Sequence, residues 1–479
     1  MLFIPGIPES EYRCAEYRVT INGQPAPVWA ARVSRYPINR VWTGRTRELS
    51  QTEIAGYCPF VMDEPVQICV EPLLRPIETV ELRPRAFGVR PAVENGVITF
   101  TLEKPQYVTL QLNGQHGALH FLPSAPKDYG VQPGENVRYY GPGIHEVGAV
   151  TLHSNETVYV DDEAVVYGTF FAMNAENVRI LGRGTIDASL FPRPEHTYGF
   201  DIPGECLLNF NRCRHVTVDG PLLRDSNLWT VVTNLCEDVR IENVKELGWR
   251  PNCDGIDLCN SKHCVIRNVF SRVYDDVIVI KGLKINDRAV EFGPESNTED
   301  ILVEDCVLWC DWGRALEIGL ETTGNEMKNI VHRRCHVIKP SFEAIDVACA
   351  FRADVHDLVY EDCSVEYDEL NYRPFLQTRD DEPYPLDPAD DYTPTALAVR
   401  IFEWGADPEG DRGHANRVTF RNIDLWSKRQ PECLLHAHDE NHRIADTVFE
   451  DIRWNGERLD TPEKLKLREE GPVDRTIVR

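Results

Sequence analysis

Three aspartates in the middle of the chain have the types and spacing needed for acid–base chemistry. Asp254 lies in "CDGIDL", and 21 residues later the doublet Asp275–Asp276 opens "DDVIVI". A short apolar strand follows in both segments, so they resemble two copies of one repeat. If the copies stack side by side, Asp254 lies within about 5–7 Å of the doublet. Carboxyl groups this close repel one another, so one of them must hold a proton.

Further polar residues align with these aspartates. Five segments form one column: "CDGIDL" (Cys253–Leu258), "DDVIVI" (Asp275–Ile280), "GRALEI" (Gly313–Ile318), "FEAIDV" (Phe342–Val347) and "ALAVRI" (Ala396–Ile401). Places four and six are apolar throughout and are expected to point inward, whereas the third and fifth places point outward. The third place is small or short, which predicts a low floor under the polar groups. The fifth place holds Asp257, Val279, Glu317, Asp346 and Arg400, and the second holds Asp254, Asp276, Arg314 and Glu343 in successive segments.

This face defines the candidate site. Two carboxyl groups across a scissile bond are what glycoside hydrolysis requires, one as general acid and one to activate water. The predicted catalytic residues are Asp254, Asp275 and Asp276. The predicted substrate-binding residues are Asn252, Asp257, Lys281, Trp312, Arg314, Glu317 and Glu343. Trp312 is included because aromatic faces stack on sugar rings, although a tryptophan is at least as often a packing residue. No metal ligand set and no cofactor are predicted.

The elements that position these residues belong to a longer repeat. Pieces such as "EDVRIEN" (ending at Asn243), "KHCVIRN" (Asn268), "NRVTFRN" (Asn422) and "ADTVFED" (Asp451) each contain a polar pair, a short alternating strand and a polar turn. An apolar residue follows the turn at equivalent points: Val244, Val269, Cys306, Cys335, Cys363, Ile423 and Ile452. Most spacings are 23 to 37 residues, too short for helix-pair repeats. The fold class predicted is all-β, a right-handed parallel β-helix with stacked coils.

The first hundred or so residues lack this repeat. Strand-like runs such as "YRVTI", "VQICV" and "VITFTL" are broken by Pro and Gly, which predicts an N-terminal β-sandwich domain. The predicted domains are residues 1–128 for the sandwich and 129–479 for the β-helix. The segment Leu370 to Asp411, rich in Asp, Pro and Tyr, is predicted to be a long loop over one face that could close one end of the cleft.

Composition excludes several partners. The formal net charge of −26 disfavours nucleic acid and anionic membranes as partners. The fifteen cysteines lie mostly in apolar strands, and the N-terminus lacks a basic leader, so they are expected to be reduced core thiols of a cytoplasmic protein. No P-loop, Rossmann fingerprint, HExxH or GxSxG motif is found. The partner expected is a carbohydrate substrate.

The region from about Gly141 to Gly319 resembles glycoside hydrolase family 28, whose members hydrolyse pectin. Asn252-Cys253-Asp254 matches the Asn-Thr-Asp motif of that family, Asp275-Asp276 matches its Asp-Asp motif, and Lys281 matches the lysine that follows. The resemblance implies an inverting mechanism with a doublet aspartate as acid. We assign Asp276 as the acid and Asp254 with Asp275 as the water-activating pair.

Two departures bear on the substrate. Gly313-Arg314-Ala315 stands where the family has Gly-His-Gly, and "FEAID" replaces its Arg-Ile-Lys motif. The sandwich joined to a β-helix is similar to the related family 49, which acts on α-glucans. Together these features favour a neutral or lightly charged glycan over a galacturonate.

Two other classes remain open from sequence. A β-helix polysaccharide lyase would hold calcium on Asp254, Asp275 and Asp276 and use Arg314 as base. A non-catalytic glycan-binding β-helix would use none of these residues chemically.

Overall fold

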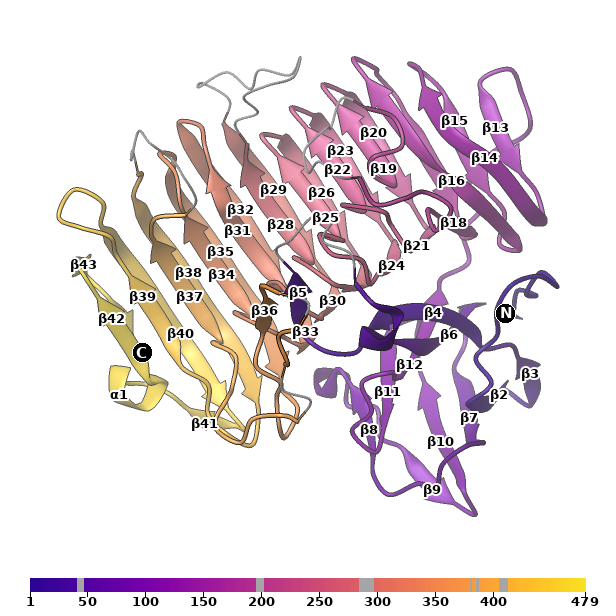
Figure 1. Ribbon diagram of the computed structural model, residues 1–479, viewed down its shortest axis with the longest axis horizontal. Coiled ribbons are helices and arrows are strands. Elements are labelled where there is room, and N and C mark those ends of the chain that lie inside the picture. Colours follow the sequence, from indigo (N-terminus) through magenta and orange to yellow (C-terminus); the bar gives the residue numbers. More distant parts are fainter. Residues whose placement is uncertain (41–46, 195–201, 284–296, 380, 385–386, 405–411) are drawn as a thin grey trace.

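The protein consists of a long stack of β-coils with a smaller β-domain packed against its side (Figure 1). The computed structural model describes residues 1–40, 47–194, 202–283, 297–379, 381–384, 387–404 and 412–479. All strands from β13 to β44 except β36 pair in one continuous 31-stranded arrangement, in which almost every strand is parallel to its partner one coil away. This is the predicted parallel β-helix, and it is right-handed.

Three columns of strands form the walls of the β-helix. The first column holds the repeat found in the sequence: β17 (Arg179–Gly182), β20 (Arg214–Asp219), β23 (Glu237–Glu242), β26 (Lys262–Arg267), β29 (Thr298–Glu304), β32 (Glu326–Arg333), β35 (Asp354–Glu366), β38 (Ala415–Trp426) and β40 (Ile444–Trp454). The third column is β18 (Thr185–Asp187), β21 (Leu222–Arg224), β24 (Lys245–Leu247), β27 (Phe270–Val273), β30 (Val307–Cys310), β33 (His336–Lys339) and the second half of β35.

The second column carries the candidate residues. Its strands are β19 (Leu208–Asn211), β22 (Val231–Asn234), β25 (Ile256–Cys259), β28 (Ile278–Gly282), β31 (Leu316–Thr322), β34 (Ile345–Cys349), β37 (Leu397–Ile401), β39 (Cys433–His436) and β42 (Leu467–Glu470). The first coils are built from β13 (Val137–Tyr140), β14 (Gly143–Leu152), β15 (Thr157–Val160) and β16 (Ala164–Met173), and the end of the chain adds β41 (Glu457–Arg458), α1 (Pro462–Leu465), β43 (Val473–Asp474) and β44 (Ile477–Val478).

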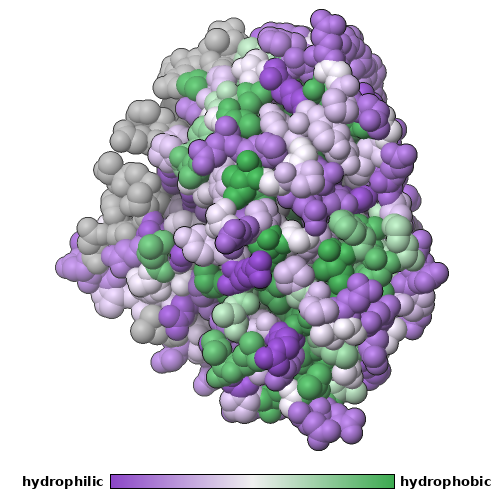
Figure 2. Space-filling model, turned by 90° about the vertical axis from the view of Figure 1, so that its right-hand side faces the viewer, coloured by the Kyte–Doolittle hydropathy of each residue, from purple (hydrophilic) through white to green (hydrophobic). Residues whose placement is uncertain are grey.

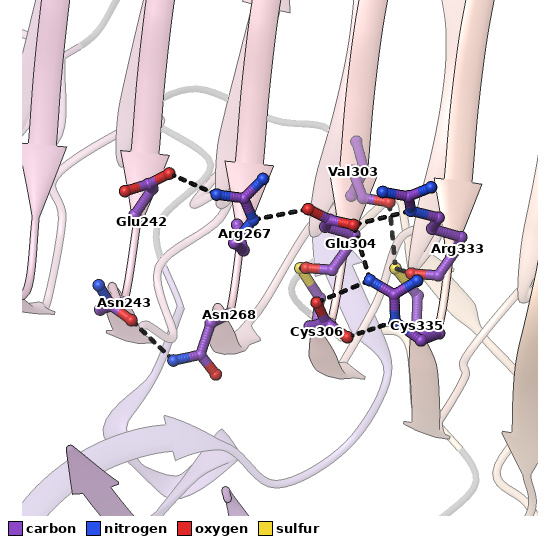
Figure 3. A network of polar contacts seen from close by, with 11 residues as sticks. Glu242, Asn243, Arg267, Asn268, Val303, Glu304, Cys306, Arg333 and Cys335 are labelled. Atoms are coloured by element: carbon purple, nitrogen blue, oxygen red, sulfur yellow. Dashed lines mark hydrogen bonds and ion pairs between the residues drawn. The ribbon is translucent and has the colours of Figure 1, made fainter. Parts of the chain in front are cut away.

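The polar turns of the repeat have a conformational cause. The turn residues Asn243, Asn268, Asp305, Arg334, Asp362, Asn422 and Asp451 all have φ between 51° and 59°. Asn and Asp enter this left-handed region more readily than other non-glycine residues, which explains why they recur there. Their side chains also form ladders between coils, and Figure 3 shows Asn268 donating to Asn243 at 2.8 Å.

Ion pairs run along the same edge, but the interior stabilises the stack. Arg267 bridges Glu242 and Glu304 at 3.0 and 2.6 Å (Figure 3). Such partly exposed pairs contribute about 0–1 kcal/mol each. The seven apolar residues predicted to recur after the turns all lie in one continuous core: Val244, Val269, Cys306, Cys335, Cys363, Ile423 and Ile452. Each coil therefore buries the apolar side of the next, as the repeat predicted.

The N-terminal domain is a β-sandwich. One sheet has the order β1 (Leu2–Phe3), β6 (Thr52–Met62), β12 (Leu119–Ser124), β11 (Val108–Leu112), β8 (Val80–Arg83), with β4 (Trp29–Ser34) also on β6. The other has the order β3 (Gln24–Ala26), β2 (Tyr17–Ile21), β7 (Val66–Pro72), β10 (Val97–Leu102), β9 (Ala92–Glu94). Phe100 and Phe121 pack edge-on between the sheets, with ring centroids 5.2 Å apart.

The sandwich packs against the third column of the β-helix through a separate apolar cluster. Trp29, Tyr57 and Leu122 of the sandwich meet Phe270 and Trp309 of the helix there. The described part of the long loop extends this contact, because its β36 (Phe375–Gln377) pairs with β5 (Ile38–Arg40) of the N-terminal segment (Figure 1). The last seven residues of the predicted loop, 405–411, lie outside the described residues.

The cysteine side chains lie mostly in the interior, as their places in apolar strands predicted. All fifteen cysteines are free and fourteen are buried. Among the described residues, no helix has the length and apolar content to span a bilayer. On the face where the first coils and the sandwich meet the viewer, hydrophobic side chains are interspersed with hydrophilic ones (Figure 2).

Candidate active site

Backbone pairing between coils brings the predicted aspartates together. The Gly255 N–H donates to the Asp276 carbonyl at 2.9 Å, and the Asp275 N–H donates to the Cys253 carbonyl at 3.1 Å. Asp254 therefore lies beside the doublet, about 4.8 Å away at the backbone, as stacking predicted. The Val277 N–H donates to the Arg314 carbonyl at 2.8 Å, which places Arg314 on the coil after the doublet.

The strands fix which side chains point inward. Residues at places four and six of the first four segments, such as Ile256 and Ile278, lie in the core of the β-helix as predicted. The prediction for the third place was wrong, because Val277, Ala315 and Ala344 also pack in that core. The strands begin only at place four, so the two-residue alternation does not extend back to the bend before it.

The alignment of the last segment was also wrong. Leu397, not Val399, pairs with Ile345, and Ala398 pairs with Asp346. The segment "ALAVRI" is therefore shifted by two residues. The shift preserves the inward and outward faces, because side chains alternate every two residues. Arg400 still reaches the coil before it and donates from Nε to Asp346 at 3.1 Å.

The face that carries these groups is buried rather than open, which corrects the prediction of exposed carboxylates on a low floor. Asp254 is 2 % exposed, Asp276 7 % and Asp275 9 %. The side chains of Arg314 and Glu343 are more accessible, at 18 % and 14 %. The cluster therefore meets solvent from the Arg314 side and through Asp275, while Asp254 is the least exposed of the three predicted catalytic aspartates.

Lys281 anchors the deep end of the cluster. Its Nζ lies 3.2 Å from Asp254 Oδ2 and 3.1 Å from Asp257 Oδ1, and 3.9 Å from the centre of the Trp229 ring. Burial raises the pKa of Asp254 well above its usual range, an effect that Lys281 opposes and the neighbouring aspartates reinforce. Burial likewise raises the pKa of Asp257 to about 7. With Lys281 charged, these two carboxyls hold a proton at neutral pH.

Two arginines cross the other end of the cluster. Arg314 Nε lies 3.1 Å from Glu343, 3.7 Å from Asp346 and 3.8 Å from Glu317. Arg400 pairs with Asp346 and lies 3.3 Å from Glu343. Burial alone would lower the pKa of Arg314, but Glu317 and Glu343 more than reverse this and raise it well above its usual range. Arg314 is thus a permanent cation.

The doublet is held by the next coil. Asp276 Oδ1 accepts a hydrogen bond from the Arg314 backbone N–H at 2.8 Å. Gly313 must be glycine here, because an added Cβ would lie 2.3 Å from Asp276 Oδ1 and 2.7 Å from Asp275 Oδ1. Burial raises the pKa of Glu317 well above its usual range, and the adjacent Asp276 adds to the rise. These two carboxyls can hydrogen-bond only when one is protonated.

The remaining candidates flank the carboxyls. Asn252 Oδ1 accepts from Arg193 at 2.6 Å, and its φ of 54° turns the chain into Asp254. Trp312 stacks on Tyr274 with centroids 6.2 Å apart and an interplanar angle of 9°, and packs edge-on against Phe342. Trp312 is therefore a packing residue, and its contact with sugar stays a prediction.

The site prediction omitted several groups that the structure brings in. Asp346 and Arg400 complete the ion-pair network, and Arg193 holds Asn252. Asp346 and Arg400 occupied the fifth place of the aligned column, a pattern that could have identified them. Arg193 contacts Asn252 across 59 residues and no local pattern marks it. Within the described ranges, no group of three or more His, Cys, Asp or Glu side chains has the arrangement of a metal site.

The fold of this chain joins a β-sandwich to a parallel β-helix. No family model and no curated protein matches it. Among solved structures, Dex49A from Penicillium minioluteum aligns with a TM-score of 0.71 at 12 % identity, over 98 % of this chain and 96 % of that chain. The shared architecture thus includes both domains.

Two further solved structures align less closely. An endo-xylogalacturonan hydrolase from Aspergillus tubingensis aligns with a TM-score of 0.47 at 12 % identity, over 71 % of this chain and 92 % of that one. An exopolygalacturonase from Thermotoga maritima aligns with a TM-score of 0.41 at 18 % identity, over 67 % and 84 %.

Proposed function

We propose that this protein is a glycoside hydrolase that cleaves O-glycosidic bonds with the Asp254–Asp275–Asp276 cluster. The observation that carries the proposal is the charge balance of the buried cluster. Seven carboxyls meet three cations, Lys281, Arg314 and Arg400. The seven carboxyls are Asp254, Asp257, Asp275, Asp276, Glu317, Glu343 and Asp346. An excess of four carboxyls in a buried site requires bound protons, and a protonated carboxyl at neutral pH is what a general acid needs.

The contacts favour Asp276 as the acid. It lies beside Glu317, whose pKa is raised well above its usual range by burial and by Asp276, so the proposed acid has a proton-bearing neighbour. Asp254, assigned from sequence to water activation, is a weaker candidate for a base because burial raises its pKa. We therefore assign water activation to Asp275, the most accessible of the three, and a supporting role to the Asp254–Lys281 pair.

A neutral or lightly charged glycan fits this environment better than a uronate. Lys281, Arg314 and Arg400 each already contact carboxylates of the protein. Binding a uronate carboxylate would require one of them to leave its partner, and the excess of carboxyls would repel the ligand. The sequence resemblance to family 28 without its uronate-binding motif agrees with this reading.

The lyase alternative is less compatible with the contacts. A lyase base must accept a proton, whereas the surrounding carboxylates raise the pKa of Arg314 well above its usual range. Asp254, one of the three proposed calcium ligands, already pairs with Lys281.

The test is a panel of neutral gluco-oligosaccharides and oligogalacturonides, followed by ¹H NMR of the anomeric protons. We expect new reducing ends from a neutral substrate, released first with inverted configuration. The variant Asp276→Asn should lower the rate about 10²–10⁴-fold, while Asp300→Asn, an exposed position of strand β29, should not. Unsaturated products that vanish in chelator would establish the lyase instead. Equal rates for Asp276→Asn and the wild type would refute the role of the cluster.

A further inference from the structure

One arginine of the N-terminal segment reaches both turns that carry the candidate aspartates. Arg47 is 8 % exposed. Its Nη1 donates to the Trp249 carbonyl at 3.0 Å, and its guanidinium lies over the Tyr274 ring, 4.4 Å from the centroid. Its Nη2 donates to the Gln51 carbonyl at 3.1 Å, which fixes the side chain to its own domain. A single side chain from outside the β-helix thus contacts two successive coils.

Each contact lies next to an aspartate. Trp249 begins the turn "WRPNCD", which the Cys253 N–H tightens by donating to the Arg250 carbonyl at 3.0 Å, and this turn ends at Asp254. Tyr274 directly precedes Asp275, whose N–H donates to the Cys253 carbonyl at 3.1 Å. Arg47 therefore contacts the Trp249 carbonyl at the start of the turn that ends at Asp254, and the Tyr274 ring directly before the doublet.

Tyr274 extends the contact to the third coil. Its hydroxyl donates to the Ile38 carbonyl, a second anchor in the N-terminal segment. Its ring stacks on Trp312, two residues before Arg314. The Arg314 N–H in turn donates to Asp276 at 2.8 Å. Arg47 thus lies at the start of a packed path that ends on the proposed acid.

Packing between the two domains does not by itself explain why residue 47 is an arginine. Among the described residues, no carboxylate forms an ion pair with it, and burial lowers its pKa below the usual range. A buried cation held only by carbonyls and a ring stabilises a seam poorly compared with an apolar side chain. Arg83 shows how an arginine that only stabilises the contact between the domains is held. It is 2 % exposed, donates to the Ile338 carbonyl at 2.7 Å across the same seam, and pairs with Glu81 and Asp368.

We propose that Arg47 is a positioning residue that sets the separation between Asp254 and the Asp275–Asp276 doublet, so that the N-terminal domain is part of the catalytic apparatus. The inference rests on the proposed glycosidase function. Displacement of a reacting group by about 1 Å can lower a rate about 10²-fold. We therefore expect the loss of the Arg47 contacts with Trp249 and Tyr274, called the clamp below, to lower the rate of catalysis more than the stability of the fold.

The experiment compares Arg47→Met, Arg47→Lys and the matched control Arg83→Met in the full chain, on the neutral substrate that the wild type cleaves. We expect Arg47→Met to lower kcat about 10–100-fold with KM changed less than about threefold. Arg47→Lys keeps a carbonyl donor and a cation over Tyr274, and should recover much of kcat. Arg83→Met should keep kcat within about twofold, although it leaves buried carboxylates unpaired. Equal kcat for the Arg47→Met and Arg83→Met variants would overturn the proposal.

A second readout separates this inference from the proposed function, because it needs no substrate. Hydrogen exchange at the Gly255 and Asp275 amides, which pair across the two coils, should be faster in Arg47→Met than in Arg83→Met. If the wild type cleaves no glycan but this difference is found, the proposed function fails while the clamp stands. If the wild type is active and neither kcat nor exchange distinguishes the two variants, the clamp alone is refuted.

Discussion

Replacing Lys281 by methionine removes the one cation at the deep end of the carboxyl cluster. Lys281 lies 3.2 Å from Asp254 and 3.1 Å from Asp257, and its side chain is 5 % exposed. Removing one partner of a buried ion pair costs about 3–5 kcal/mol, because it leaves the other charge without compensation. We expect a loss of this size in the free energy of unfolding of Lys281→Met at pH 8.

The loss should depend on pH, with a sign that follows from the pKa of Asp257. In the wild type that pKa is about 7, so Asp257 is ionised at pH 8 and pairs with Lys281. In the variant the pKa rises further above its unfolded value of about 3.9, and the folded state keeps a proton that the unfolded chain releases. Stability then falls with rising pH by about 1.36 kcal/mol per unit for one carboxyl. The difference between variant and wild type should therefore be about 1.4 kcal/mol larger at pH 8 than at pH 6.

The assay is urea unfolding followed by tryptophan fluorescence at pH 6 and pH 8. The control is Lys262→Met, which breaks an ion pair of similar length, 3.1 Å, with partners 38 % and 20 % exposed. That surface pair should be worth at most about 1 kcal/mol with no such pH dependence. The reasoning is refuted if Lys281→Met lies within 1 kcal/mol of the wild type at pH 8, or if its loss is the same at both pH values.

Three further predictions concern groups around the site and the core. In the wild type, stability should fall between pH 4 and pH 7, because Asp257 with its raised pKa keeps its proton in the folded state over that range while the unfolded chain loses it. Asp257→Asn should make this fall smaller when it is measured by calorimetry. An unchanged slope would contradict the assignment. In thermal unfolding, Gly255→Ala should destabilise the protein by about 1–3 kcal/mol, because its Cβ would lie 2.3 Å from the Val277 carbonyl oxygen. The control Gly134→Ala should have little effect, because no atom lies closer than 3.9 Å to the added Cβ. Thiol titration should find fifteen reactive cysteines in denaturant but only Cys69, the one that is not buried, reacting rapidly in the native protein; rapid reaction of several thiols would contradict the packing of the coil interior.

The repeat could be predicted because stacking imposes the same requirement on every coil. Places such as Ile256 and Ile278 must be apolar in each copy, and a turn residue such as Asn268 must tolerate a positive φ. The meeting of Asp254 with the doublet follows directly from that period. The register of Ala396–Ile401 could not be fixed in this way, because Leu397 follows its partner Ile345 by 52 residues, whereas Ile345 follows its own partner Leu316 by only 29. A shift of two residues also leaves every apolar side chain inward.

The burial of the site and its outer contacts depended on parts of the fold that the repeat does not encode. The alternation rule assumes a strand, whereas in the first four segments the second and third places precede the strand, so the rule does not fix where their side chains point. The Arg47 contact with Trp249 spans 202 residues and two domains, so no spacing in the sequence indicates it. Local pattern therefore predicts which residues share a coil, while domain packing decides what holds them in place.

The most direct measurement is the rate of glycosidic cleavage by Asp276→Asn and Asp254→Asn beside the wild type, with folding of each variant checked by circular dichroism. If a carboxyl of this cluster supplies the proton, Asp276→Asn should fall about 10²–10⁴-fold while its circular dichroism is unchanged. Wild-type rates in both folded variants would show that bond cleavage, if it occurs, takes place elsewhere on the protein.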